Sequence, residues 1–148
     1  MLTQTALMSS QPTNNWRQPV DPHAIIVENL DDIIAAINGR QAMADLRLWS
    51  PPDAASSHGV LWFLSLQQAT RERFRGAAPE IVFDCGDRAD FAHAALREGI
   101  RAICFRGSAG MLAKLRAIAS DVGAVIETQH PALADLLPGL HGSASPGN

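Results

Sequence analysis

Two short segments of the chain carry the residue types best suited to chemistry. The first is Asp84-Cys85-Gly86-Asp87, which places two carboxylates and a thiol within four residues. Such a carboxylate could act as a general acid or base beside a nucleophilic thiol, provided that a nearby cation lowers the pKa of the thiol. Arg106 ends the next apolar segment and could supply that cation. The candidate catalytic residues are therefore Asp84, Cys85 and Asp87.

The same segment also fits a structural role. Gly86 would form the turn, and Asp87 or Asp90 would cap the helix that follows. Asp84 would then pair with Arg106 as a structural bridge between neighbouring strands. We favour this interpretation, because the sequence identifies no base that a cysteine enzyme would use.

The second segment, Arg106-Gly107-Ser108-Ala109-Gly110, runs from a predicted strand into a predicted helix. The free amides at the amino end of such a helix can receive an anion, and an arginine there adds charge-assisted contacts. The spacing matches neither a Walker loop nor a GxGxxG fingerprint, and Ser108 also fits a simple helix N-cap. The candidate ligand-binding residues are Arg106, Gly107, Ser108 and Gly110.

Several other classes of chemistry find no support in the sequence. The five histidines are scattered, so no metal site is expected, and no cofactor motif is present, so no cofactor is expected either. A net charge of −3 without a run of lysine or arginine argues against a nucleic-acid partner. Cys85 and Cys104 form no Cys-x-x-Cys motif and are expected to be reduced and unpaired.

The pattern of a strand followed by a helix occurs twice between residues 79 and 128. This repeat positions the two segments at 84–87 and 106–110. An apolar run from Glu80 to Asp87 precedes a helix that ends near Gly99. The second copy begins at Ile100, and its helix ends near Gly123. A strand, a crossover helix and a second strand place the two strands parallel in one sheet. We expect one continuous core that contains Ile81, Phe83, Ile103 and Phe105.

The whole chain predicts a single α/β domain built on five strands. These strands are expected at about 24–28, 46–50, 80–84, 100–105 and 124–127. Apolar residues at helical spacing predict a long helix over 60–74. The last three strands are almost wholly apolar, as in a mostly parallel sheet covered by helices on both faces. An open three-layer sheet is favoured over a partial β/α barrel, because five strands are too few to close.

The two ends of the chain differ in composition from the domain at 21–137. Residues 1–20 and 138–148 are rich in small and polar residues without periodicity, and we expect flexible tails there. No export signal or membrane span of about 20 apolar residues is recognisable. The expectation is a soluble cytoplasmic protein with no membrane partner.

Two phrases resemble a known family. Ala95-Leu96-Arg97-Glu98-Gly99 leads into the strand that ends at Arg106, and an apolar stripe runs from Leu112 to Ile118 on the last long helix. Residues 79–119 thus resemble the last two strand–helix units of a response-regulator receiver domain, which has a flavodoxin-like fold. The resemblance implies a parallel α/β architecture.

The chain departs from the receiver pattern at the residues that carry the family's chemistry. Arg106 and Gly107 stand where that family has a lysine followed by a proline. The central phospho-acceptor aspartate has no counterpart, since 60–66 is Val-Leu-Trp-Phe-Leu-Ser-Leu. The phrases at 27–32, 50–52 and 84–87 are also similar to small bacterial α/β proteins without an assigned role. Neither resemblance implies an active phosphoryl switch.

Two functions fit these residues. The favoured one is a small non-catalytic module that binds a small anionic ligand or a protein partner, with Trp16, Trp49 and Trp62 as candidate contact residues; a homo-oligomer also fits. The alternative is a small lyase or hydrolase that acts on an anionic substrate at the 84–87 and 106–110 turns. The two differ in geometry, because an enzyme requires its reactive groups to converge within hydrogen-bond reach.

Overall fold

The protein's structure is a computed structural model that describes residues 24–39, 46–76 and 78–134. Both predicted tails, 1–20 and 138–148, lie outside the described residues, and so does Trp16. Within the described ranges, no helix has both the length and the apolar character needed to cross a membrane.

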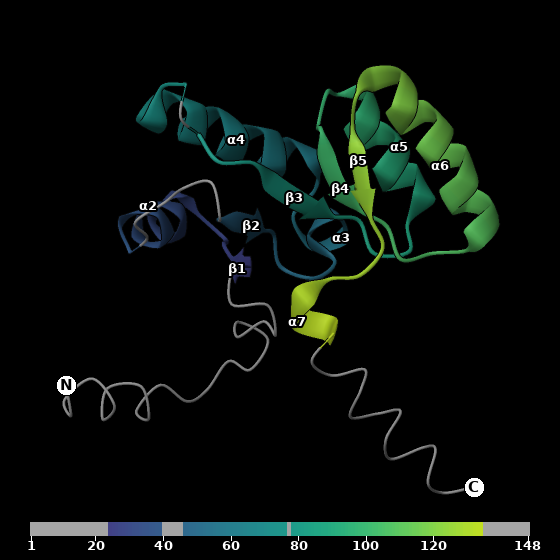
Figure 1. Cartoon of the computed structure of the whole chain (residues 1–148), viewed down its shortest axis with the longest axis horizontal. Coiled ribbons are helices and arrows are strands. Elements are labelled where there is room, and N and C mark those ends of the chain that lie inside the picture. Colours follow the sequence, from purple (N-terminus) through teal and green to yellow (C-terminus); the bar gives the residue numbers. More distant parts are fainter. Residues whose placement is uncertain (1–23, 40–45, 77, 135–148) are drawn as a thin grey trace, which may run out of the picture.

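Five parallel strands form one open sheet in the order β1-β2-β3-β4-β5 (Figure 1). The strands are β1 (Ala24–Ile26), β2 (Arg47–Trp49), β3 (Ile81–Asp84), β4 (Ala102–Cys104) and β5 (Val125–Glu127). The register pairs Phe83 with Ile103 and Asp84 with Cys104. The predicted open parallel sheet, with the last three strands side by side, is confirmed.

Helices alternate with these strands along the chain. They are α2 (Leu30–Asn38), α3 (Ala54–Ser57), α4 (Val60–Phe74), α5 (Ala89–Arg97), α6 (Ala109–Val122) and α7 (Pro131–Ala134). The long helix predicted over 60–74 is confirmed as α4. A local cap defines where α2 begins: the side chain of Asn29 accepts a hydrogen bond from the Asp32 amide, at 2.8 Å.

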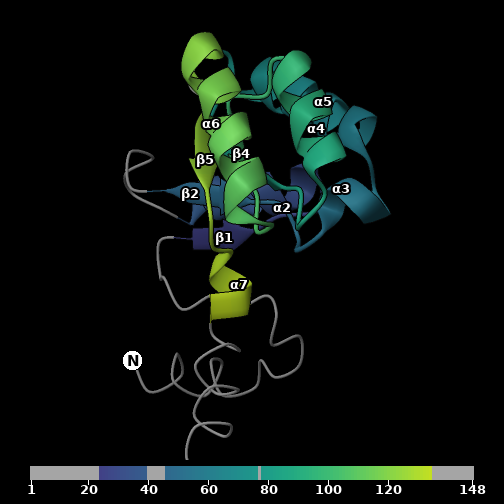
Figure 2. The same ribbon diagram turned by 90° about the vertical axis from the view of Figure 1, so that its right-hand side faces the viewer.

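The two faces of the sheet are covered unequally. Ile81, Phe83, Ile103 and Phe105 point to one face and join buried residues of α2 to α6 in the main core, as predicted. On the other face, alternate strand residues form a smaller cluster with Ala132 of α7. Figures 1 and 2 show α7 on the opposite side of the strands from α4, α5 and α6. Within the described ranges helices therefore lie on both faces, and the face opposite α2 to α6 carries one short helix, α7.

The unequal cover follows from the strand order. Each crossover moves to the next strand in the same direction, so the connecting helices α2 to α6 collect on one face. A flavodoxin-like sheet has the order 2-1-3-4-5, in which one crossover moves the other way. The chain therefore shares the parallel α/β sheet of that architecture and differs from it in strand order.

The sheet is concave on the α7 side. Arg47 of β2 forms an ion pair with Glu127 of β5, at 3.1 Å between Nη2 and Oε2, although β3 and β4 lie between these strands. Neighbouring strands are about 4.8 Å apart, so this contact requires both side chains to reach across a curved surface. The sheet stays open, as predicted, with helices on both of its faces.

Candidate functional site

Polar residues gather at the carboxyl edge of the sheet, where parallel α/β proteins bind their ligands. Ser50 and Asp53 follow β2, Asp84 ends β3, Arg106 follows β4 and His130 follows β5. The strand order brings these segments side by side in sequence order. The geometry of each group decides what chemistry the edge can perform.

Asp84 is fully buried and accepts hydrogen bonds through both carboxylate oxygens. Arg106 donates from Nε to Oδ1 at 3.3 Å and from Nη2 to Oδ2 at 2.8 Å, and the Asp53 amide donates to Oδ2 at 2.6 Å. The Asp84 amide in turn donates to Oγ of Ser50 at 2.8 Å. A buried carboxylate held by a guanidinium in this way is a structural ion pair.

Arg106 is shared between two carboxylates. Its Nη2 also donates to Oδ1 of Asp53 at 3.1 Å, and its side chain is 23% exposed. Burial lowers the pKa of Arg106, but the hydrogen bond to Asp84 and the charges of Asp84 and Asp53 outweigh this effect and raise it. Within the described ranges, Nη1 alone of its nitrogens has no hydrogen-bond partner. The positive charge of Arg106 is therefore largely offset.

Asp53 and Gly86 fit together through their backbone conformations. Both have φ of 59°, in the left-handed region that aspartate tolerates and glycine favours. A Cβ at Gly86 would overlap Oδ1 of Asp53, and the Gly86 carbonyl accepts a hydrogen bond from the Arg106 amide at 2.7 Å. Gly86 thus forms the predicted turn and also leaves room for Asp53.

Both cysteines are free, as predicted, and both are buried. Burial, followed by the charges of Asp84 and Asp90, raises the pKa of Cys85 far above its usual range. Burial and the neighbouring Asp84 raise the pKa of Cys104 in the same way. A nucleophilic thiol requires the opposite shift, so these surroundings are those of structural cysteines.

Asp87 lies apart from this cluster. It is exposed, and none of the described side chains forms a hydrogen bond with it. The N-cap position of α5 is Arg88, which makes no side-chain cap and instead binds Asp90 through two hydrogen bonds of 3.0 and 2.7 Å. The expected capping by Asp87 or Asp90 is thus replaced by the Arg88–Asp90 ion pair at the start of the helix.

The other candidate ligand-binding residues follow Arg106 into α6. Oγ of Ser108 accepts a hydrogen bond from the Met111 amide at 3.3 Å, so Ser108 is the N-cap of α6. Gly107 packs below the Phe105 ring, which a Cβ would overlap. Ser108 and Gly110 are exposed. The structure therefore brings Arg106 to Asp84 and Asp53 and leaves the 108–110 turn in solvent.

His130 also belongs to the carboxyl edge, as its position just after the last predicted strand indicated, although the histidines as a set are scattered along the chain. It is 1% exposed; Nε2 donates to the Ser50 carbonyl at 2.7 Å, and Nδ1 accepts from the Ala132 amide at 3.1 Å. Its ring makes an edge contact with Trp49, with 5.3 Å between centroids. Burial lowers the pKa of His130, so it is neutral and fixes the start of α7.

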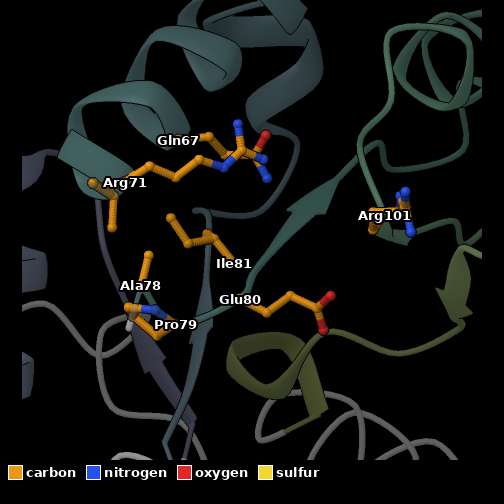
Figure 3. A pocket seen from close by; sticks show the side chains of 8 residues that line it. Gln67, Arg71, Ala78, Pro79, Glu80, Ile81 and Arg101 are labelled. Carbon is orange, nitrogen blue, oxygen red and sulfur yellow. The ribbon is translucent and has the colours of Figure 1, made fainter. Parts of the chain in front are cut away.

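A separate cavity of about 160 Å³ lies at the opposite, amino edge of the sheet (Figure 3). It is lined by Gln67, Thr70, Arg71, Ala78, Pro79, Glu80, Ile81 and Arg101. Nothing in the sequence pattern indicated it, because its residues come from α4 and from the starts of β3 and β4.

Two further findings limit the kinds of site present. No group of three or more histidine, cysteine, aspartate or glutamate residues in the described part of the chain is placed to hold a metal ion. Comparison of the chain with protein-family models, with curated proteins and with solved structures finds no match.

Proposed function

We propose that the protein is a non-catalytic module that binds a small anionic ligand. The observation that carries this proposal is the state of the titratable groups at the carboxyl edge. Asp84 and Arg106 bind each other, and both ring nitrogens of His130 are engaged with backbone groups. These groups hold the fold together and have little capacity left for chemistry.

The same observation counts against the lyase or hydrolase alternative. A general acid or base needs an accessible atom and a pKa near the working pH. Both oxygens of Asp84 already accept hydrogen bonds, and the thiol of Cys85 is buried with a raised pKa. Asp87 is accessible, but within the described ranges no side chain forms a hydrogen bond with its carboxylate.

Guanidinium groups with unused donors support an anion as the ligand. Nη1 of Arg106 remains available beside the amino end of α6, and Arg71 and Arg101 at the other edge have no hydrogen-bond partner within the described ranges. Guanidinium groups bind carboxylates and phosphates through charge-assisted hydrogen bonds.

A thermal-shift screen of the full chain tests this proposal. The panel contains small phosphorylated and carboxylated compounds at constant ionic strength, so that general salt effects cancel. A ligand at 100 times its Kd stabilises the folded state by about 2.7 kcal/mol, which gives a measurable rise in Tm. The same samples, followed by NMR of the ligand, should show no conversion.

The variant Cys85→Ala separates the module from the enzyme. We expect it to keep the ligand-dependent rise in Tm, although its own Tm is lower because a buried side chain is shortened. Turnover of a panel compound that disappears in Cys85→Ala or in Asp87→Asn would contradict the proposal and support the enzyme. Absence of any ligand-dependent shift across the panel would refute the binding function itself.

A further inference from the structure

We infer that the cavity between α4 and the starts of β3 and β4 is the place where the protein takes its anion, and that this anion is a small oxyanion the size of a phosphate group. The inference rests on the proposed anion-binding function. It assigns that function to the amino edge of the sheet and not to the Arg106 turn.

Hydrogen-bond donors line this cavity from two sides. Gln67 and Arg71 are one turn apart on α4 and extend to the same side of the helix, above Ile81 (Figure 3). Arg101 lines the cavity from the segment before β4. None of the three side chains has a hydrogen-bond partner in the described part of the chain. Their donors are therefore available to a ligand.

Charge distinguishes this place from the carboxyl edge. Arg106 faces two carboxylates, each within hydrogen-bond distance of its guanidinium. The cavity contains two arginines and a single carboxylate, that of Glu80, which points away from Arg71 in Figure 3. An incoming anion would have to displace an existing ion pair at Arg106, whereas at the cavity it would meet an excess positive charge.

The size and walls of the cavity restrict the ligand. A cavity of about 160 Å³ has room for a small oxyanion such as a phosphate or a short carboxylate. Ala78, Pro79 and the buried Ile81 supply apolar walls. Because Arg71 and Arg101 are exposed, solvent reaches a bound anion and salt weakens its attraction to the guanidinium groups.

Because the dipole of α4 opposes an anion at the end of this helix, binding also requires the second arginine, Arg101. Arg71 lies in the last turn of α4, where the negative end of the helix favours a cation and opposes an anion. Arg71 by itself is therefore explained by the helix. Arg101 comes from a different element and adds the charge that overcomes this opposition. Both arginines should matter equally for binding.

The test is a titration of the ¹⁵N-labelled full chain with inorganic phosphate, followed by ¹H–¹⁵N NMR and compared with a chloride series at equal ionic strength. We expect saturable shifts of the amides of Arg71, Ile81 and Arg101. Arg71→Gln and Arg101→Gln should each weaken phosphate binding about tenfold or more, the usual effect of losing a hydrogen bond to a charged group.

Arg73→Gln is the matched control. It removes the same charge from the same turn of α4, but Arg73 lies over the Phe74 ring and does not line the cavity. We expect it to change the phosphate Kd by less than about twofold. The spectra of all three variants report in the same experiment whether the fold is intact.

The outcomes separate the two proposals. Saturable shifts at the cavity that both glutamine variants abolish support the inference. Shifts confined to the 106–110 amides and unaffected by these variants would overturn the inference while keeping the anion-binding function. An equal effect of Arg73→Gln, or the same shifts with chloride, would show only non-specific attraction and would overturn the inference. No response to phosphate or to any panel anion would overturn both.

Discussion

The contacts of the buried Asp84 carboxylate give it a structural role. Removing such a group from water is costly, and the cost is offset only if both oxygens find strong donors. The Arg106 guanidinium and the Asp53 amide supply these donors, from the loops that follow two different strands. The ion pair therefore ties the ends of β2, β3 and β4 together.

Breaking this pair from one side should be strongly destabilising. Arg106→Ala leaves the buried Asp84 carboxylate without its main partner, and we expect the free energy of unfolding to fall by about 3 kcal/mol, at the lower end of the range for buried pairs because Arg106 is partly exposed. Urea denaturation measures this change. Arg88→Ala, which breaks the exposed pair with Asp90, should cost far less, and equal losses would contradict the structural role.

His130 should make stability depend on pH in one direction. Burial lowers its folded-state pKa below 6.5, so the unfolded chain takes up a proton first as the pH falls. The stabilisation is complete above pH 6.5 and is lost as the pH falls towards the folded-state pKa. The groups that face the ring are Trp49, the Ser50 carbonyl and the charges of Asp84, Arg106 and Asp53.

Urea denaturation between pH 5 and pH 8 measures this dependence. His130→Gln, whose amide can still donate to the Ser50 carbonyl, should flatten the profile in the acid range. His58→Gln is the control, because His58 is exposed and lies against Trp62, away from α7. A profile that His130→Gln leaves unchanged would assign the acid sensitivity to other groups.

At the scale of single residues, the sequence predicted the pairing of two side chains at the carboxyl edge but not the contacts of the others. Asp84 and Arg106 end neighbouring strands, so their pairing followed from the strand–helix repeat alone. Asp53 joins them only because it adopts a left-handed conformation after two prolines, and His130 only because the chain turns into α7 directly after β5. Both depend on loop geometry that no periodicity encodes.

The strand and helix elements followed closely from local patterns. Runs of apolar residues predicted β3 and β4. Apolar residues at helical spacing predicted α4, in a segment whose composition also suits a strand. Where a turn requires a glycine, the local sequence determines the turn as closely as it determines a helix. Gly86 adopts φ of 59° beside Asp53, whereas Gly110 lies in the first turn of α6 with nothing near its Cβ direction.

Alanine substitutions at these two glycines should have opposite effects. Gly86→Ala forces a left-handed alanine and a clash with the Asp53 carboxylate, and we expect a loss of more than about 1 kcal/mol. Gly110→Ala should stabilise α6 by up to about 1 kcal/mol, since alanine is the better helix former. Thermal denaturation of both variants checks the pair, and a stable Gly86→Ala would refute the tight fit at this turn.

The arrangement of the whole molecule was less accessible from the sequence. Five parallel strands were expected, but local patterns do not state which strand pairs with which. The order β1-β2-β3-β4-β5 depends on every crossover moving in the same direction, and among the described helices it places α2 to α6 on one face and α7 on the other. Trp49, a candidate contact residue, is consequently buried under α7. Because helices cover the two faces of the sheet unequally, we expect these helices to detach from the two faces at different rates.

The two cysteines report on the two faces separately. Cys85 belongs to the core beneath α2 to α6, and Cys104 belongs to the smaller cluster that includes Ala132 of α7. Both are fully buried with raised pKa values, so a thiol reagent reaches them only when the structure opens.

We expect Cys104 to be labelled faster than Cys85 under native conditions. Detaching the four-residue α7 exposes little surface, whereas reaching Cys85 requires the long helices to separate from the sheet. Peptide mapping by mass spectrometry after timed labelling of the full chain compares the two rates, and Ala132→Gly, which loosens α7, should accelerate Cys104 alone. Equal rates at both cysteines, matching global unfolding, would mean that α7 does not open separately from the rest of the domain.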